Sequence, residues 1–509
     1  MPDIQIDMFE VQLGAAILLQ FRLDGRTVRV LADAGVKAPK YPPTHVRDKL
    51  IALLPPDDRR IDLIIGTHYD EDHLNGLAPV IDDSRFEVGE AWLPPVANDT
   101  QVFPLDLALT AANLLPHQFA SEAGEATFQS YIDRKRADIS GLRVVGLKGN
   151  EEAYKFEAQH FADHHGDELA FFRFHAGRED EQCGHCNNLD AELPDELDEL
   201  VDIQLRRMNS VYRFAGETTF KDLAANLEHT MSPNSEIAAA QFRTVDNIRK
   251  GVAEDAINAK ALFDVVKALQ RRSIPFKTEI VPDGTPRFYR WNATTGKFTL
   301  SRDTGDGLAF TLLGPSQSLV RKHRDRLPVV EYAKAAFFFL GEIRSITPSN
   351  QLSYIGCFQF AGQRILVSGD AGCVDFKQDN KSYYPQLLAQ LKPLHVVQVA
   401  HHGGNNAHFY RVLSAAEYEK QDDVSYLLLS HAENDRTRPS DVFHDFLLTA
   451  RNDGDDIRLL FTSQPTRDKV VDYLDAIHPT VGAVAQKGDV QLAFKNSAWQ
   501  VTRHAIKVI

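Results

Sequence analysis

Cysteine is scarce in this chain, which has only Cys183, Cys186, Cys357 and Cys373 among 509 residues. So few thiols argue against a small secreted fold stapled by disulfide bonds. An apolar run of about 18 residues, the length that crosses a bilayer, is also missing. The opening residues, MPDIQIDMFEVQ, are acidic where a secretory signal peptide would be basic. We therefore expect a cytoplasmic protein with no membrane partner.

Basic residues are outnumbered, with 56 Lys and Arg against 71 Asp and Glu, which gives a net charge of -15. This balance argues against a broadly basic nucleic-acid-binding surface, although a local basic groove or a bound metal could still attract phosphate. Hydrophobic residues are 43% and charged residues 25% of the chain, as in ordinary globular proteins. The length suggests two or three structural units, and the oligomeric state stays open.

The most informative stretch is IDLIIGTHYDEDHLNGL, residues 61–77. An apolar run typical of a buried strand ends at Gly66, and five side chains able to bind metal follow within six residues. Imidazole nitrogen and carboxylate oxygen suit a divalent, moderately hard ion, and a loop at a strand end can hold them at fixed angles. The alternative is a solvated polar turn, but turns normally draw on Gly, Asn, Pro and Ser. We therefore predict a metal site in this loop.

The spacing of His68, Asp70, Asp72 and His73 resembles the metal-binding signature of the metallo-β-lactamase superfamily, whose usual form is His-x-His-x-Asp-His. Asp70 takes the place of the second His. That variant is carried by the hydrolase domain of the competence DNA-uptake channel proteins (ComEC type) and their soluble relatives. The resemblance implies an α/β (α+β) fold: a four-layer αββα sandwich of two mixed sheets, with helices outside and the site at one edge.

A hairpin is expected ahead of this loop, with strands at 17–21 and 28–32 joined by the turn at Asp24-Gly25. It leads to Asp33, which taken alone would be a turn residue. The resemblance instead implies that Asp33 orients the metal loop from behind the ligands. The stretch VRDKLIALL, between the hairpin and the metal loop, is expected to be helical.

Two residues of the second half also resemble the family. Asn350 stands where many members place a third His ligand, and the competence-type members have Asn there as well. Asp370 follows the apolar strand at 364–368 through Ser-Gly-Asp and matches the carboxylate that bridges the two ions. A lone Gly-Asp would be a common turn, but here the metal loop precedes it and a His pair follows.

The His pair is His401-His402, which a strand at 394–400 delivers into Gly403-Gly404. This closely resembles the family's His-His-Gly-Ser. One His should bind metal, and the other should face the substrate, where it could protonate a leaving oxygen or stabilise charge. We favour His401 as the ligand.

Arg438 marks a departure from the family. It stands in Asn-Asp-Arg-Thr-Arg-Pro-Ser, where the family often has Gly-His-Pro-Ser. Either an imidazole that binds metal or substrate has been lost, or a guanidinium now holds an anionic group such as phosphate. A surface Arg in a loop is the ordinary alternative.

The resemblance covers residues 1–96 and 256–509, which we predict to be the two halves of one metallo-β-lactamase domain. Residues 97–255 are predicted to be a largely helical insertion or cap beside the site. Within it, Cys183 and Cys186, with His175, could be a dithiol redox motif, a structural zinc site or ordinary thiols. A helix is predicted around 257–269, and further strands at 86–93, 276–281, 308–313, 354–360, 457–462 and 490–494.

These residues together suggest a hydrolase with two divalent metal ions, Zn²⁺ or Mn²⁺, with Mg²⁺ as a further candidate. The ions would lower the pKa of a bridging water and stabilise the charge of the transition state. The resemblance to nucleases and phosphodiesterases implies a phosphodiester substrate, with nucleic acid as one candidate, and two metals can clamp both oxygens of an in-line displacement. The alternatives are a small-molecule hydrolase acting on a cyclic nucleotide, phosphocholine, lactone or ester, a binding or regulatory protein with a degraded site, and an interaction protein working through the insertion. The expected ligands are His68, Asp70, Asp72, His73, Asp370 and His401, and the expected catalytic residues are Asp72, His402, Asn350 and Arg438.

Overall fold

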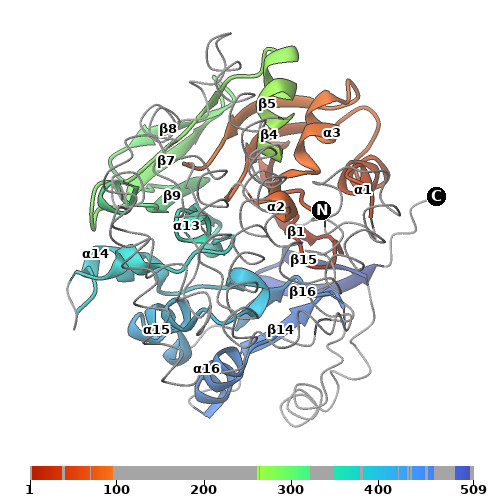
Figure 1. The fold of residues 1–509 in the computed structure, drawn as a ribbon. Helices are drawn as coiled ribbons and strands as arrows, with labels where there is room; N and C mark the ends of the chain where they lie inside the picture. Colours follow the sequence, from red (N-terminus) through yellow and green to blue (C-terminus); the bar gives the residue numbers. More distant parts are fainter. Residues whose placement is uncertain are drawn as a thin grey trace, which may run out of the picture.

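The structure is a computed structural model. The expected insertion at 97–255, with Cys183 and Cys186, lies outside the residues that it describes, so its helical character stays a prediction. In the part described, the chain forms two mixed β-sheets of eight strands each, accompanied by helices (Figure 1). The described residues are 3–36, 41–68, 70–95, 261–262, 264–320, 348–378, 382–421, 424–432, 435, 438–452, 457–463 and 488–504.

The first sheet joins both ends of the chain, in the order β16-β15-β1-β2-β3-β4-β5-β6. Neighbouring strands from β16 to β3 are antiparallel, and those from β3 to β6 are parallel. The predicted hairpin is confirmed as β2 and β3, and the predicted strand at 490–494 pairs with β1. The strands are β1 (Ile4–Met8), β2 (Ile17–Leu23), β3 (Arg26–Ala32), β4 (Arg60–Ile65), β5 (Glu87–Trp92), β6 (Phe276–Lys277), β15 (Asp489–Lys495) and β16 (Ala498–His504).

The second sheet comes entirely from residues after 286, in the order β14-β13-β12-β11-β10-β9-β7-β8. The strands from β11 to β14 are parallel, and those from β8 to β11 are antiparallel. The strands predicted at 308–313, 354–360 and 457–462 are confirmed. The strands are β7 (Arg287–Asn292), β8 (Lys297–Ser301), β9 (Ala309–Gly314), β10 (Ile355–Phe360), β11 (Gln363–Val367), β12 (Val396–Gln398), β13 (Ser425–Leu429) and β14 (Ile457–Phe461).

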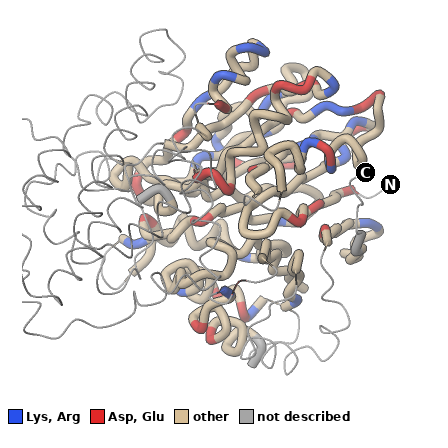
Figure 2. Tube along the Cα trace, turned by 45° about the vertical axis from the view of Figure 1, so that its right-hand side comes forward, with Lys and Arg blue, Asp and Glu red and all other residues tan. Residues whose placement is uncertain are grey.

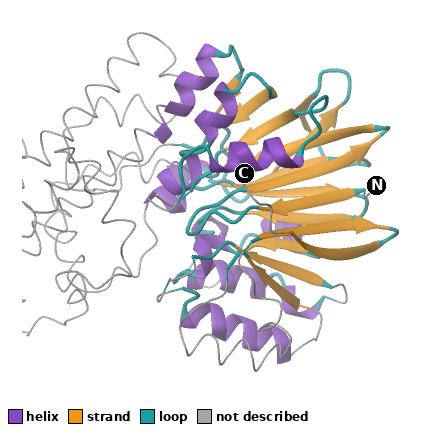
Figure 3. Ribbon diagram, turned by 90° about the vertical axis from the view of Figure 1, so that its right-hand side faces the viewer, coloured by secondary structure: helices purple, strands orange, loops and turns teal. Residues whose placement is uncertain are grey.

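Apolar side chains on β4 alternate between two cores. Leu63 and Ile65 belong to a buried cluster to which both sheets contribute, and Ile61 and Ile64 belong to a cluster shared with helices. A strand buried on both faces reads as a continuous apolar run, which is the pattern seen in the sequence. Helices and strands lie in separate layers in Figure 3.

Two sets of helices pack against the sheets. The first sheet packs against α1 (His45–Leu53), α3 (Leu77–Asp82) and the helical residues 264–271, through one apolar cluster. The second sheet packs against α14 (Pro385–Leu388), α15 (Ala407–Ala415) and α16 (Asp441–Asn452), through another. The predicted helix in VRDKLIALL is confirmed as α1. Among the described residues, no helix has the length and hydropathy of a membrane span.

The strand predicted at 276–281 is wrong in extent, because β6 contains only Phe276 and Lys277. The amide of Glu279 donates to the hydroxyl of Tyr354 at 2.8 Å instead of to a neighbouring strand. Val281 then forms only an isolated bridge with Ser316. Side-chain capture of one backbone donor therefore ends the strand early.

Loops gather where several parallel strands end. The segments that follow β3, β4, β11, β12 and β13 contain, in turn, Asp33, His68, Asp370, the His pair and His431. In α/β sheets ligands bind at the carboxyl ends of the parallel strands, because the loops there converge. Loops cluster at one end of the strands in Figure 3. This edge therefore carries the candidate site.

Candidate metal centre

The loop at 66–73, which is predicted to bind metal, is held in place where its backbone closely approaches other segments. A Cβ on Gly35 would lie 1.8 Å from the carbonyl oxygen of Asp72, so the two main chains meet where no side chain fits. The amide of Ala15 donates to the same oxygen at 3.1 Å, and the amide of Ala34 donates to the carbonyl of His73 at 3.0 Å. The short helix α2 (Glu71–Leu74), which carries Asp72 and His73, is therefore tied to the end of the hairpin.

Asp33 lies beneath this loop. Its backbone has a φ of 57°, and its side chain is fully buried. Its carboxylate accepts the Thr67 amide at 2.6 Å and the Thr67 hydroxyl at 2.5 Å, and it lies 2.8 Å from Nδ1 of His73. The hydrogen-bond pattern thus assigns the proton to Nδ1 and directs Nε2 of His73 to the other side. Asp33 lies where a residue that orients the ligand is expected.

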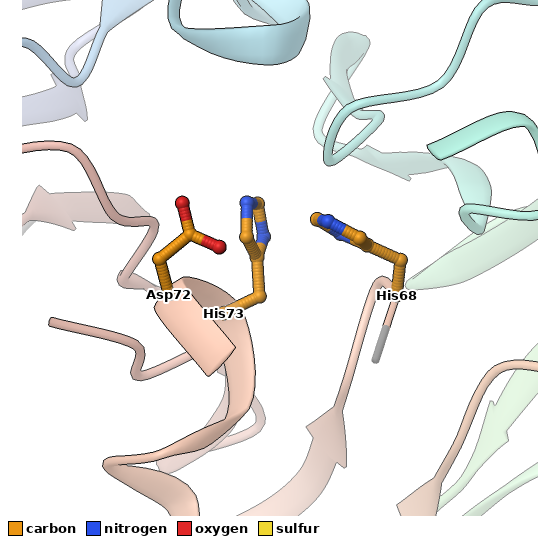
Figure 4. A group of neighbouring side chains, drawn as sticks. All are labelled: His68, Asp72 and His73. Atoms are coloured by element: carbon orange, nitrogen blue, oxygen red, sulfur yellow. The ribbon is translucent and has the colours of Figure 1, made fainter. Parts of the chain in front are cut away.

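His68, Asp72 and His73 face one another at this end of the first sheet (Figure 4). Each offers one ligand atom, and these atoms all lie within 4.8 Å of one another. The rings of His68 and His73 meet with centroids 3.8 Å apart. Three of the predicted ligands therefore form one compact group.

A second group joins the first half of the chain to the second. His73, Asp370 and His402 also have ligand atoms within 4.8 Å of one another. Nε2 of His73 lies 3.2 Å from Oδ1 of Asp370, and Nε2 of His402 lies 3.8 Å from both that oxygen and Oδ2 of Asp72. Residues from the first and the second half of the chain thus meet around one imidazole.

The donor atoms of the site fit a divalent cation. Among the described residues, the buried nitrogens Nδ1 and Nε2 of His68 and Nε2 of His402 have no hydrogen-bond partner. Nε2 of His73 has only its ionic contact with Asp370. Burying polar atoms without partners costs free energy, and a metal ion would satisfy them. Imidazole and carboxylate without thiolate suit Zn²⁺ or Mn²⁺. His68, Asp72, His73, Asp370 and His402 are therefore the residues that could hold metal.

The charges of the site are strongly perturbed. Burial alone would raise the pKa of Asp370, but nearby His73, with His402 and His401, holds that pKa well below its usual value. Burial opposes protonation of His73, yet Asp370 and Asp33 together raise its pKa well above the ordinary value. Burial lowers the pKa of His402 to about 4, so this imidazole is neutral and can act as a ligand.

The two histidines of the tandem pair differ in their surroundings. Nε2 of His401 lies 3.9 Å from Oδ2 of Asp370, but His401 belongs to neither group, and its side chain is 24% exposed. The geometry therefore favours His402 as the ligand, whereas the sequence analysis favoured His401. Both residues have left-handed backbones, with φ of 53° and 51°. Such strained residues cluster at functional sites.

Asp70 also lies outside the two groups. It immediately precedes α2, and its Oδ2 is 3.4 Å from Nε2 of His68. The structure thus brings Asp70 beside one candidate ligand without making it a member of either group.

The segment that contains Asn350 contacts the loop that carries His68. Asn350 is buried in α13 (Pro348–Gln351), and the amide of Tyr354 just after this helix donates to the carbonyl of Thr67 at 2.7 Å. The segment that carries Asn350 therefore runs beside the residue that precedes His68.

Arg438 is held by Asp435. Oδ1 of Asp435 accepts the amide of Arg438 at 3.0 Å, and Oδ2 lies 3.3 Å from the Arg438 guanidinium. The Arg438 side chain is only 19% exposed. The structure therefore disfavours an ordinary surface arginine here.

Sequence reasoning missed two residues that hold the Asp370 loop. Nδ2 of Asn406 donates to the carbonyl of Ala371 at 2.8 Å, and Nδ1 of His408 lies 3.1 Å from the carbonyl oxygen of Gly372. Asn406 is also the N-cap of α15, accepting from the amide of Phe409. An Asn just ahead of an apolar helical pattern is a recognisable N-cap signal, but nothing local reveals the carbonyl that it binds.

Comparison with known proteins adds no family assignment. No protein-family model matches the chain, and no curated protein matches it.

Proposed function

We propose that this chain is a metal-dependent hydrolase of the metallo-β-lactamase fold that acts on phosphodiesters. The proposal rests on one observation: buried imidazole nitrogens without partners in the described part of the chain converge with Asp72 and Asp370 at the strand-end loops. Two mixed sheets that share an apolar core, with helices packed against them, are consistent with the four-layer αββα sandwich of that family.

The residues of the site would have separate roles. His68, Asp72, His73, Asp370 and His402 would hold the metal, which when bound would supply Lewis acidity and a water of lowered pKa. Asp33 fixes the tautomer of His73 by accepting from Nδ1, so that Nε2 stays available as a donor atom. The carboxylates of Asp72 and Asp370 supply negative charge for binding cations.

The charge distribution favours a small phosphodiester over a long nucleic acid. The chain has a net charge of -15, and acidic and basic residues are interspersed along the described trace in Figure 2. Binding of a polyanionic strand requires a tract of Lys and Arg that neutralises several phosphates. A small-molecule phosphodiester, such as a cyclic nucleotide, can bind without such a tract of Lys and Arg.

Two measurements test the proposal together. Metal analysis of the purified protein should find a bound divalent metal, and the protein loaded with Zn²⁺ or Mn²⁺ should hydrolyse bis(p-nitrophenyl) phosphate faster than plasmid DNA. Asp72→Asn should abolish hydrolysis. The matched control is Asp82→Asn, because Asp82 lies ten residues further on and pairs with Arg271 at the surface. Full activity in Asp72→Asn, or a protein that binds no metal, would overturn the proposal.

A further inference from the structure

We infer that the segment 438–440 holds the turn at 401–403 in its left-handed conformation, so that Ser440 and His431 are positioning residues for the candidate ligand His402. The inference rests on the proposed function and deepens it, because it names residues outside the two candidate groups that set how tightly the chain would bind metal.

The turn at 401–403 has an unusual backbone. His401 and His402 have φ of 53° and 51°, and Gly403 follows with φ of 75°. The left-handed region is unfavourable for residues with a Cβ, and it is normally adopted by single residues. Two successive histidines in this region persist only where the surrounding structure fixes them. The hydrogen bond within the turn, from the amide of Gly404 to the carbonyl of His401 at 2.7 Å, does not bind the carbonyl of Gly403.

Ser440 binds this turn twice. Its amide donates to the carbonyl of Gly403 at 2.8 Å, and its hydroxyl donates to the carbonyl of Gly404 at 3.0 Å. Pro439 packs against the same turn, because a Cβ on Gly403 would lie 3.2 Å from the Cβ of Pro439. The carbonyl of Ser440 accepts the amide of His444, in the first turn of α16, at 3.2 Å. Ser440 therefore joins the turn to the start of this helix.

His431 holds the other end of the segment. Its side chain is fully buried, and its Nε2 lies 2.9 Å from the carbonyl oxygen of Arg438. Burial lowers the pKa of His431, so the ring is neutral, and a hydrogen bond to a carbonyl assigns its proton to Nε2. The amide of His431 donates to the hydroxyl of Thr462, just after β14, at 3.1 Å. A continuous series of contacts therefore links the end of β14 to the turn that carries His402.

The place of His402 in the candidate site depends on this turn. Its Nε2 lies 3.8 Å from both Oδ2 of Asp72 and Oδ1 of Asp370. Metal sites require ligand distances within about 0.2 Å of their usual values. Relaxation of His402 to an ordinary φ would reorient its imidazole. Loss of the contacts made by Ser440 should therefore weaken metal binding.

Calorimetric titration of the metal-free full chain with Zn²⁺ measures this effect. Ser440→Ala should weaken binding about tenfold, as when a residue that orients a ligand is lost. Ser440→Thr keeps the hydroxyl and should restore most of the affinity. Ser425→Ala is the matched control, because Ser425 is also a fully buried serine, and its hydroxyl binds that of Tyr418 at the start of β13. Equal affinity in the wild type and Ser440→Ala would overturn the inference.

Hydrogen exchange tests the same contacts without metal. Amides of residues 399–406 should exchange about tenfold faster in metal-free Ser440→Ala and His431→Phe than in the wild type, because both variants release the turn. Mass spectrometry of peptic peptides resolves this segment. Peptides from β11 should exchange equally in all three proteins, which would show that the second sheet is intact. Equal exchange of residues 399–406 in the three proteins would overturn the inference.

The two tests separate failure of this inference from failure of the proposed function. If the wild type binds Zn²⁺ but hydrolyses no phosphodiester, the hydrolase proposal fails, and weaker binding by Ser440→Ala still supports the inference. If the wild type binds no metal, the proposed function fails, and hydrogen exchange alone decides whether the segment 438–440 holds the turn. Faster exchange with unchanged Zn²⁺ affinity would show that Ser440 supports only the fold, and would overturn its positioning role. Thermal unfolding of each variant identifies any loss of fold.

Discussion

Nδ1 of His73 lies 2.8 Å from Oδ2 of Asp33, and both side chains are fully buried. The carboxylate lies behind the imidazole, on the side away from Asp370. A carboxylate in this position fixes the orientation of a metal-binding histidine and increases its basicity. The pair therefore explains how a loop after β4 can present a defined donor atom.

Asp33→Asn should weaken metal binding about 10- to 100-fold, the usual effect of losing such a partner. The amide keeps an oxygen for the Thr67 amide but presents no carboxylate charge to His73. Calorimetric titration of the metal-free protein with Zn²⁺ measures the change. Asp62→Asn is the matched control, because Asp62 is also fully buried and accepts a backbone amide, from Arg29, near the opposite end of β4. Equal affinity in the wild type and Asp33→Asn would contradict this prediction.

The tandem histidines should separate metal binding from turnover. His402→Ala removes a member of the second candidate group, so it should lower the metal content of the purified protein. His401→Ala should retain the metal content and lower the rate of phosphodiester hydrolysis. Elemental analysis combined with steady-state kinetics distinguishes the two variants. Metal loss in His401→Ala alone would instead support the assignment favoured by the sequence.

Asp375 should make the protein less stable as the pH rises. Burial raises the pKa of its carboxyl group from 3.8 to about 6, although Oδ2 accepts the amide of Ser316. The folded state thus binds this proton more tightly than the unfolded state, and the stabilisation present below about pH 4 is lost as the pH rises to about 6. The shift corresponds to about 3 kcal/mol, at 1.36 kcal/mol per pKa unit.

Urea unfolding of the wild type and Asp375→Asn at pH 4 and pH 7 tests this effect. The variant cannot lose this proton, so its free energy of unfolding should rise relative to that of the wild type between the two pH values. Asn can still accept the Ser316 amide. The same difference between the two proteins at both pH values would show that Asp375 does not titrate in this range.

Lys49→Met should destabilise the fold by about 3–5 kcal/mol, because removing one partner leaves a buried charge uncompensated. Nζ of Lys49 lies 2.6 Å from Asp489, and the two side chains are 4% and 5% exposed. Lys392→Met is the control, because Lys392 pairs with Glu417 at the surface, where the two side chains are 47% and 52% exposed. Thermal and urea unfolding should show a large loss in the first variant and no measurable change in the second. Similar stability of the two variants would refute the prediction.

Local sequence patterns predicted most strand positions. The apolar runs that became β4, β9 and β14 read clearly because strands buried on both faces need continuous apolar side chains. Pattern reading failed at β6, where Phe276 and Lys277 alone pair with β5. The hydroxyl that takes the Glu279 amide comes from Tyr354, far along the chain, and no local pattern reveals it.

The amino-acid sequence by itself determined which candidate metal-binding side chains are present and their order along the chain. Strands and loops could be predicted because their patterns involve residues that are close in sequence. The sequence therefore predicted the loop with His68, Asp72 and His73 and the presence of Asp370 after a strand. Only the tertiary structure decided that Asp370 and His402 meet His73, since the relative placement of the two sheets follows from the packing of their shared core.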